Sequence, residues 1–589
     1  MLLAQFSDYS RPLEQPAEES AGGAGSPYPF IRLADGQLCS QFAAQRGLEW
    51  QEQRTLRLPA AFSPQVLIPS IFNGEFLPGA DTTRVAHRRD HARAGLIASL
   101  PVCWREIMGF RRALCALLLT LSAASPLMRC AASSQTLKPA PCTLNKVHGL
   151  CGTFFVPEDR SHPERRMIGL RIFEVPATAA KKPADPLFLI EGGPGMSTVE
   201  HLSNTELLGL YRRIARNRDI VAIEERGVGQ SNGLTCPEPA RRTLKDDFLD
   251  LVESARSCLP TVQAHAAPDQ YHSLNAIADL DAVRAALGYD KIDLWGLSHG
   301  TREALLYAER YPQHARAVVL EAPFAPDEHM PAGLAEREDE VLRGTFADCA
   351  ADHDCAAQYP NLQRDYQQAL ATFAHGPVRV KLTDPYTKRE TTIALSKGRF
   401  AETIRDLLYM IPLANQVPAL LHSAAGGDWK PIVLFSAKSR IADTGFPFGM
   451  WLSYVCAEDL PYIDAGRERL RSNNTLLGNY RVEQQKAACG IWPAAHLPKG
   501  WDWPTGSKVP ILFMVGALDV ITSPALARHI AAPFPNAKVV EVAHGTHLLV
   551  GQPGEDECLL RIEGDFIEQG QATGLETACA ASLARGPWK

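Results

Sequence analysis

A serine held between two glycines, in the Gly-Leu-Ser-His-Gly segment at residues 296–300, constrains the fold of this chain more than any other feature. Residues 291–295 alternate as a short buried strand does, and residues 301–312 have helical spacing and end at a proline. So tight a turn leaves no room for a Cβ atom at the flanking positions, and both are glycine. The pattern predicts a strand–turn–helix unit that presents Ser298 at the carboxyl end of a sheet, above a helix N-terminus.

Strand-like and helical patterns alternate along much of the chain after residue 145. The strand-like runs are residues 167–175, 186–190, 219–223, 291–295, 315–320, 509–515 and 537–542. Such alternation predicts an α/β protein whose mostly parallel sheet has helices on both faces. A Gly-x-Ser-x-Gly turn in such a sheet is the nucleophile elbow of the α/β-hydrolase fold, and we therefore expect that fold.

The alternation stops after residue 323 and resumes at residue 509. The residues between have largely helical patterns, which we interpret as a lid inserted into the core, over the sheet edge where ligands bind. The expected organisation is a first part of the hydrolase core at residues 133–327, the lid at 328–508 and the second part of the core at 509–589.

Residues 1–107 differ from the rest of the chain, because they hold ten arginines, no lysine and no sustained helical or strand period. We interpret them as a disordered or misassigned extension. Residues 108–132 have the basic start, the apolar stretch and the small residues of a secretory signal peptide. The apolar stretch is shorter than the roughly 20 residues that span a bilayer. We expect translation from Met108, export to the periplasm or beyond, and no stable membrane anchor after cleavage; a genuine leader before an apolar anchor is the alternative.

Cysteine content and charge limit the cofactors and partners. Ten cysteines follow residue 132, and an even number after an export signal indicates disulfides. Their grouping predicts pairing between neighbours: Cys142 with Cys151, Cys236 with Cys258, Cys349 with Cys355, Cys456 with Cys489, and Cys558 with Cys579. The sequence has no C-x-x-C and no H-E-x-x-H motif, so we expect no metal site and no cofactor. A net charge of −6 without a long basic run makes a nucleic-acid partner unexpected.

A serine alcohol is a poor nucleophile until a base takes its proton and an acid orients that base. In the α/β-hydrolase fold these residues follow in the order serine, acid, histidine. Asp519 at the end of the strand-like run 509–515 is the expected acid, with Glu321 as its rival. His544, directly after the run 537–542 and before a glycine, is the expected base, and His547 is the alternative, expected only as a hydrogen-bonding neighbour.

The oxyanion formed during acyl transfer needs backbone N–H donors. One is expected from His299, the residue after the nucleophile. The other is expected from Gly193, in the glycine-rich segment 192–195 that follows an early strand.

Together these motifs resemble a known family. They are Gly192-Gly-Pro-Gly195, Arg226-Gly-Val-Gly-Gln-Ser231, residues 280–288, the elbow, Asp519 with Thr522, and His544-Gly545. From about residue 140 to 575 the chain resembles the secreted proline iminopeptidase and tripeptidyl aminopeptidase-type hydrolases of peptidase family S33. The resemblance implies a serine exopeptidase that acts on free peptide N-termini. His299 and Glu303 depart from the usual residues of that family.

An aminopeptidase has to bind the ammonium group of its substrate, and buried carboxylates are the usual means. Glu225 and Glu458 are the main candidates, and a structural role is the alternative for each. Two other functions stay open: an esterase or amidase for small non-peptide acyl substrates, and a binding protein that keeps the hydrolase fold without catalysis.

Overall fold

The structure is a computed structural model that describes residues 136–237, 243–248, 250–441, 446–502 and 506–588. The extension expected at residues 1–107 and the signal peptide expected at 108–132 lie outside these ranges. Among the described residues, no helix combines the length and the apolar character that crossing a membrane requires.

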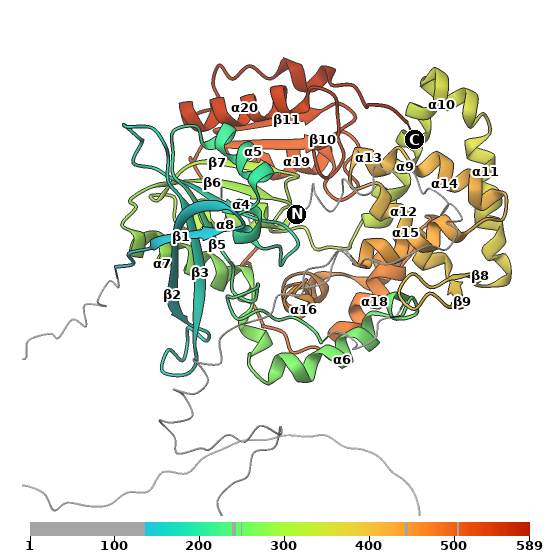
Figure 1. The fold of residues 1–589 in the computed structure, drawn as a ribbon, viewed down its shortest axis with the longest axis horizontal. Helices are drawn as coiled ribbons and strands as arrows, with labels where there is room; N and C mark the ends of the chain where they lie inside the picture. Colours follow the sequence, from blue (N-terminus) through green and yellow to red (C-terminus); the bar gives the residue numbers. More distant parts are fainter. Residues whose placement is uncertain (1–135, 238–242, 249, 442–445, 503–505, 589) are drawn as a thin grey trace, which may run out of the picture. The chain divides into compact units, whose positions relative to one another are not determined.

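A nine-stranded sheet, ordered β1-β2-β3-β5-β4-β6-β7-β10-β11, forms the centre of the described chain (Figure 1). Its strands are β1 (Ala140–Leu144), β2 (Val147–Pro157), β3 (Met167–Val175), β4 (Leu187–Ile190), β5 (Ile220–Ile223), β6 (Ile292–Leu297), β7 (Ala315–Glu321), β10 (Ile511–Gly516) and β11 (Ala537–Val542). Every pair from β5 to β11 is parallel, whereas β1, β2, β3 and β5 pair antiparallel. The expected α/β-hydrolase fold with a mostly parallel sheet is confirmed.

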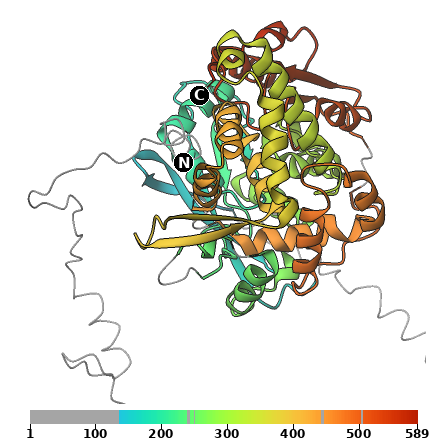
Figure 2. The ribbon, with the colours of Figure 1, turned by 90° about the vertical axis from the view of Figure 1, so that its right-hand side faces the viewer.

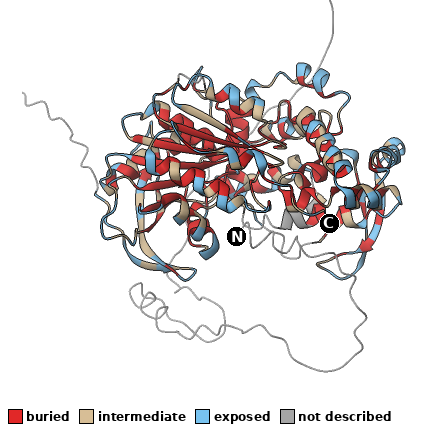
Figure 3. Cartoon of the chain, turned by 90° about the horizontal axis from the view of Figure 1, so that it is seen from above, coloured by how far each residue is buried: buried red, intermediate tan, exposed pale blue. Residues whose placement is uncertain are grey.

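Helices cover both faces of the sheet because the side chains of its central strands alternate between two apolar cores. In β4, Leu187 and Leu189 pack in one core, and Phe188 and Ile190 pack in the other. The first core includes residues of α5 (Thr205–Ala215) and α20 (Glu555–Gln569). The second includes residues of α7 (Ser273–Leu287), α8 (His299–Arg310) and α19 (Pro524–Ala531). Figure 3 shows the resulting buried centre between partly exposed helices.

Two strands at one edge of the sheet, β1 and β2, have no counterpart among the strand-like runs of the sequence. Most of their residues are half-buried or exposed, so they lack the apolar pattern that marked the central strands. An edge hairpin of this kind is difficult to recognise from hydrophobic periodicity.

A largely helical cap is inserted between β7 and β10 (Figures 1 and 2). It contains α9 (Leu334–Ala351), α10 (His353–Gln358), α11 (Leu362–Thr372), α12 (Lys397–Leu407), α13 (Ile411–Ala414), α14 (Val417–Ala425), α15 (Lys430–Ile441), α16 (Phe448–Tyr454), α17 (Ala465–Ser472), α18 (Tyr480–Cys489) and the hairpin of β8 (Val378–Thr383) and β9 (Glu390–Leu395). Much of it packs around an apolar core of its own, which also contains Val520 and Ile521 from the loop after β10. The cap is therefore in direct contact with the carboxyl edge of the sheet.

All five neighbour pairings expected from the cysteine grouping are present as disulfides. One closes the β1–β2 hairpin, between Cys142 and Cys151. Another, between Cys456 and Cys489, ties the segment after α16 to the end of α18. Such bonds persist in oxidising compartments, which agrees with the expected export.

The glycine at position 300 is a steric requirement, which a substitution can test. A Cβ atom there would lie 2.4 Å from the backbone oxygen of Ile190, so we expect Gly300→Ala to lower the free energy of unfolding by about 1–3 kcal/mol or more. Gly209, inside α5, has open space around its Cα and is the matched control. Gly209→Ala should stabilise the helix by roughly 0.5–1 kcal/mol. Chemical denaturation measures both, and equal stability of the two variants would contradict this packing argument.

Candidate functional site

Ser298 sits at the corner between β6 and α8 in a strained backbone conformation, with φ 51° and ψ −120°. The backbone N–H of Ser298 donates to the oxygen of Glu321 (2.9 Å), which anchors the corner to the neighbouring strand β7. A Cβ atom at Gly296 would lie 2.9 Å from the oxygen of Gly300. The elbow expected from the sequence is thus present, and strain of this kind is concentrated at functional sites.

A continuous chain of hydrogen bonds joins Ser298, His547 and Asp519. The Ser298 hydroxyl Oγ lies 2.8 Å from Nε2 of His547. The other ring nitrogen, Nδ1, lies 2.9 and 3.1 Å from the two carboxylate oxygens of Asp519. The imidazole and the carboxylate are almost completely buried, with 2% and 1% of each residue exposed. This arrangement can move a proton from the serine to the imidazole while the carboxylate fixes the ring orientation.

Asp519 is held rigidly by the loop that follows β10. Its Oδ1 accepts hydrogen bonds from the backbone N–H groups of Ile521 (2.7 Å) and Thr522 (2.8 Å). Its Oδ2 accepts from the hydroxyl of Thr522 (2.6 Å). The carboxylate proposed as the rival acid, on Glu321, is instead a buried group whose pKa is raised to about 8 by burial.

The expectation that His544 contacts Ser298 is wrong, and His547 takes that position. The Nδ1 atom of His544 lies 2.9 Å from Oδ2 of Asp348 on cap helix α9. After β11 ends, the chain first packs Gly545 against the end of β10: a Cβ atom on Gly516 would lie 2.3 Å from the oxygen of Gly545. Only after this close passage does the chain reach Ser298. The sequence shows both histidines, but it does not show the close contact of Gly545 with Gly516. That contact decides which histidine reaches Ser298.

The glycine-rich segment expected to supply an oxyanion donor lies beside the serine. A Cβ atom at Gly192 would lie 3.1 Å from Cβ of Ser298, and Gly193 follows with φ 121°. His299, the other expected donor, begins α8. The carboxylate of Glu191, which precedes the segment, accepts a hydrogen bond from the hydroxyl of Tyr211 (2.5 Å). The glycine-rich segment therefore lies next to Ser298, and the expected donor Gly193 follows Gly192 directly.

Glu458, one of the two expected substrate-binding residues, is fully buried in an ion pair. Its carboxylate accepts from Arg302 (3.0 Å) and from the backbone N–H and hydroxyl of Ser273 (2.6 and 3.0 Å). Burial alone would raise its pKa, but the neighbouring His299 and Arg302 lower it to about 2. With its oxygens occupied by partners in the chain, Glu458 fits a structural role better than substrate binding.

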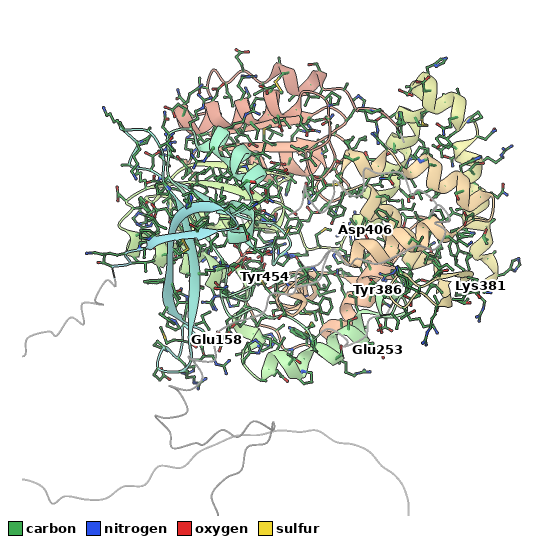
Figure 4. The ribbon with its side chains drawn as sticks, viewed as in Figure 1. Glu158, Glu253, Lys381, Tyr386, Asp406 and Tyr454 are labelled. Atoms are coloured by element: carbon green, nitrogen blue, oxygen red, sulfur yellow. A yellow bond between two sulfur atoms is a disulfide. The ribbon has the colours of Figure 1, made fainter. Side chains whose placement is uncertain are left out.

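Glu225, the second expected residue, forms a pair with the carboxyl group of Glu303, which is not among the expected site residues. The hydroxyl of Tyr454 is hydrogen-bonded to Glu225 and lies 3.3 Å from Oε1 of Glu303 (Figure 4 labels Tyr454). Burial raises the pKa of Glu225 to about 7. Burial and the adjacent Glu225 raise the pKa of Glu303. Glu225 is half-buried and Glu303 is buried. The signal for Glu303 was an acidic residue on the helix directly after the elbow.

The described part of the chain brings no three His, Cys, Asp or Glu side chains together in an arrangement that could hold a metal ion.

The chain is similar to known α/β-hydrolases and peptidases. Residues 185–408 match the family model described as alpha/beta hydrolase fold, and residues 474–579 match the one described as TAP-like protein. Serine protease Hip1 of Mycobacterium tuberculosis is 29% identical over 253 residues, which are 38% of this chain and 46% of that protein. Tripeptidyl aminopeptidase of Streptomyces lividans is 26% identical over 199 residues, 30% of this chain and 35% of that protein.

Carboxylesterase B of Mycobacterium tuberculosis is 30% identical over 190 residues, 30% of this chain and 36% of that protein. Each match thus spans less than half the length of the relative. The fold and the matches define the chain as an α/β-hydrolase. Within that class, they confirm the resemblance to peptidase family S33, with its tripeptidyl aminopeptidase-type members.

Substitution of the two histidines tests which one is the base. We expect His547→Gln to lower kcat by about 10⁴-fold or more, as loss of a catalytic base does in serine hydrolases. His544→Gln, the matched control three residues away, should lower kcat by about tenfold at most, because a displaced base costs less than an absent one. Steady-state turnover of an arylamide or ester measures both. A larger loss in His544→Gln than in His547→Gln would reverse the assignment.

Proposed function

We propose that the protein is an exported serine exopeptidase that cleaves peptide bonds near free N-termini. The observation that carries this proposal is the hydrogen-bonded set of Ser298, His547 and Asp519. The TAP-like match and the similarity to a tripeptidyl aminopeptidase support the peptidase class. The five disulfides support export.

In the proposed mechanism, Oγ of Ser298 attacks the carbonyl carbon while His547 takes the hydroxyl proton. The backbone N–H groups of His299 and Gly193 stabilise the resulting oxyanion. The protonated imidazole then gives its proton to the leaving amine, the C–N bond breaks and an acyl-enzyme remains. Water then attacks the acyl-enzyme, with His547 again as the base. This step releases the carboxylic acid product and restores the serine hydroxyl. Asp519 stays ionised and holds the imidazole in the required tautomer throughout.

Glu225, with Glu303 beside it, is proposed to receive the ammonium group of the substrate. An ammonium group next to two carboxyls favours their ionised form, and a charge-assisted hydrogen bond of this kind contributes about 1.5–3 kcal/mol. Glu225 is half-buried, and the phenol of Tyr454 orients its carboxylate. Glu458 has no part in this step, because Arg302 neutralises it.

An esterase or amidase that acts on small acyl substrates would use the same triad, and the similarity to a carboxylesterase favours it as the second candidate. The two functions differ in whether the substrate must have a free N-terminal amine. A peptidase of the proposed kind prefers aminoacyl or tripeptidyl arylamides over their N-blocked forms, whereas the alternative enzyme does not.

A panel of free and N-blocked arylamides, with simple esters, tests the function. We expect wild type to prefer the free amines by at least about tenfold in kcat/KM, and Ser298→Ala to be inactive. Glu225→Gln should lower kcat/KM for free amines by about 10–100-fold and leave the blocked substrates unchanged. Glu253→Gln is the control, because Glu253 is an exposed carboxylate on α6 (Leu251–Gln263), labelled in Figure 4. A preference for blocked substrates or esters would favour the second candidate.

The pH dependence of this preference follows from the pKa of Glu225. The ammonium of a peptide N-terminus has a pKa of about 8, and Glu225 ionises above about 7, so both partners are charged between these values. We expect the ratio of kcat/KM for free over blocked substrates to be greatest there. As the pH falls below 7, Glu225 binds a proton and the ratio falls; above 8 the substrate loses its charge and the ratio falls again. A ratio that stays constant from pH 5 to 7 in wild type would contradict the role of Glu225.

A further inference from the structure

The histidine loop, residues 543–551 between β11 and α20, carries the imidazole that meets Ser298. The hydrolase core contacts this loop through backbone hydrogen bonds. The backbone N–H of Leu518 donates to the oxygen of Gly545 (2.7 Å), and the loop continues from there to His547. The core also contacts the loop after His547, because Glu321 on β7 accepts a hydrogen bond from the N–H of Leu549, whose side chain is buried in the core. The core therefore contacts the loop on both sides of His547, and the cap adds contacts of its own.

Cap residue Tyr409, just after α12, contacts the loop at and after His547. Its backbone oxygen accepts a hydrogen bond from the N–H of Leu548 (2.9 Å), and Met410 forms a parallel bridge with the same residue. The Tyr409 ring meets the His547 ring edge to face, with centroids 5.1 Å apart at 75°. The guanidinium of Arg405 in turn lies over the Tyr409 ring, 5.1 Å from its centroid. The imidazole is thus covered by a side chain that is itself held by α12.

A second cap residue, Asp348 on α9, contacts the loop before His547. It is the partner of His544, at 2.9 Å, and it also accepts from the guanidinium of Arg585 (2.6 Å). Arg585 is buried and donates through Nε to Oδ1 of Asn415, after α13 (2.9 Å). The side-chain amide of Asn415 donates to the oxygen of Pro587 (2.8 Å). Asp348 therefore ties His544 both to the cap and to the C-terminal segment.

From these contacts we infer that Tyr409 and Asp348 are positioning residues, which hold the imidazole of His547 between Ser298 and Asp519. The inference rests on the proposed function and extends it: the cap, besides covering the site, is part of the structure that makes the base effective. Tyr409 fixes the loop after His547 and Asp348 fixes it before. A displacement of about 1 Å at such a base costs about 10²-fold in rate.

The geometry separates this role from substrate binding. Tyr409 touches the imidazole through its ring and the loop through its backbone, so loss of the ring should loosen the base in every complex, whichever substrate is bound. The effect should fall on kcat, because the distance from Oγ of Ser298 to Nε2 of His547 matters for proton transfer and not for substrate affinity. The ring is what contacts His547, so a phenylalanine should preserve the position.

The test compares Tyr409→Leu, Tyr409→Phe, Asp348→Asn and Ser298→Ala with wild type in kcat, KM and Tm, using one free arylamide. We expect kcat to fall by about 10–100-fold in Tyr409→Leu and about tenfold in Asp348→Asn, with KM within about threefold of wild type. Tyr409→Phe should keep wild-type kcat. The control is Glu390→Gln, which removes an exposed cap ion pair with Lys381 (2.7 Å) and should change nothing.

The outcomes separate the two proposals. If Ser298→Ala is inactive while Tyr409→Leu and Asp348→Asn keep wild-type kcat, this inference is overturned and the proposed function stands. If Ser298→Ala is as active as wild type, the proposed function fails, and this inference fails with it. Should Tyr409→Leu not fold, Asp348→Asn decides, because its partially exposed side chain can be changed without opening a cavity. A rise in KM with unchanged kcat in either variant would mean substrate binding and would overturn the positioning role.

Discussion

The hydrogen bond between Oγ of Ser298 and Nε2 of His547, 2.8 Å long, is the interaction on which the rest of the site depends. It joins residues 249 positions apart in sequence, one on a strand-to-helix corner and the other on a loop after the last strand. The parallel order of β6, β7, β10 and β11 makes this possible, since all their carboxyl ends meet at one edge of the sheet. The fold therefore serves to bring three distant loops to a single point.

Glu225 and Glu458, the two carboxylates considered for the substrate ammonium, differ in their charged partners. Beneath the cap, Arg302 neutralises Glu458, and the pair stays ionised in the interior. Among the described residues, no cation lies within hydrogen-bonding distance of Glu225 or Glu303, and burial raises the pKa of both carboxyl groups. A buried carboxyl pair without a counter-charge is costly unless a ligand supplies one. That is the physical reason to place a substrate ammonium at Glu225 and not at Glu458.

The sequence alone predicts a feature wherever local geometry requires a particular residue type. The elbow glycines, the acid at the end of β10 and the five disulfides were all predicted, because each follows from neighbours in the chain. The choice between His544 and His547 was not, since it depends on how far the loop travels past Gly516 before it turns. Glu303 and Tyr409 were also missed as members of the site. Tyr409 belongs to the site through packing between the cap and the core, which no local pattern encodes, whereas Glu303 had a local signal, an acidic residue on the helix directly after the elbow.

The most direct test of this account is mass spectrometry of the protein after reaction with a fluorophosphonate, with peptide mapping of the adduct. The account predicts one phosphonyl group per chain, on Ser298, and a labelling rate that falls by orders of magnitude when His547 is replaced by glutamine. A chain that stays unmodified, or one modified at a residue other than Ser298, would contradict it.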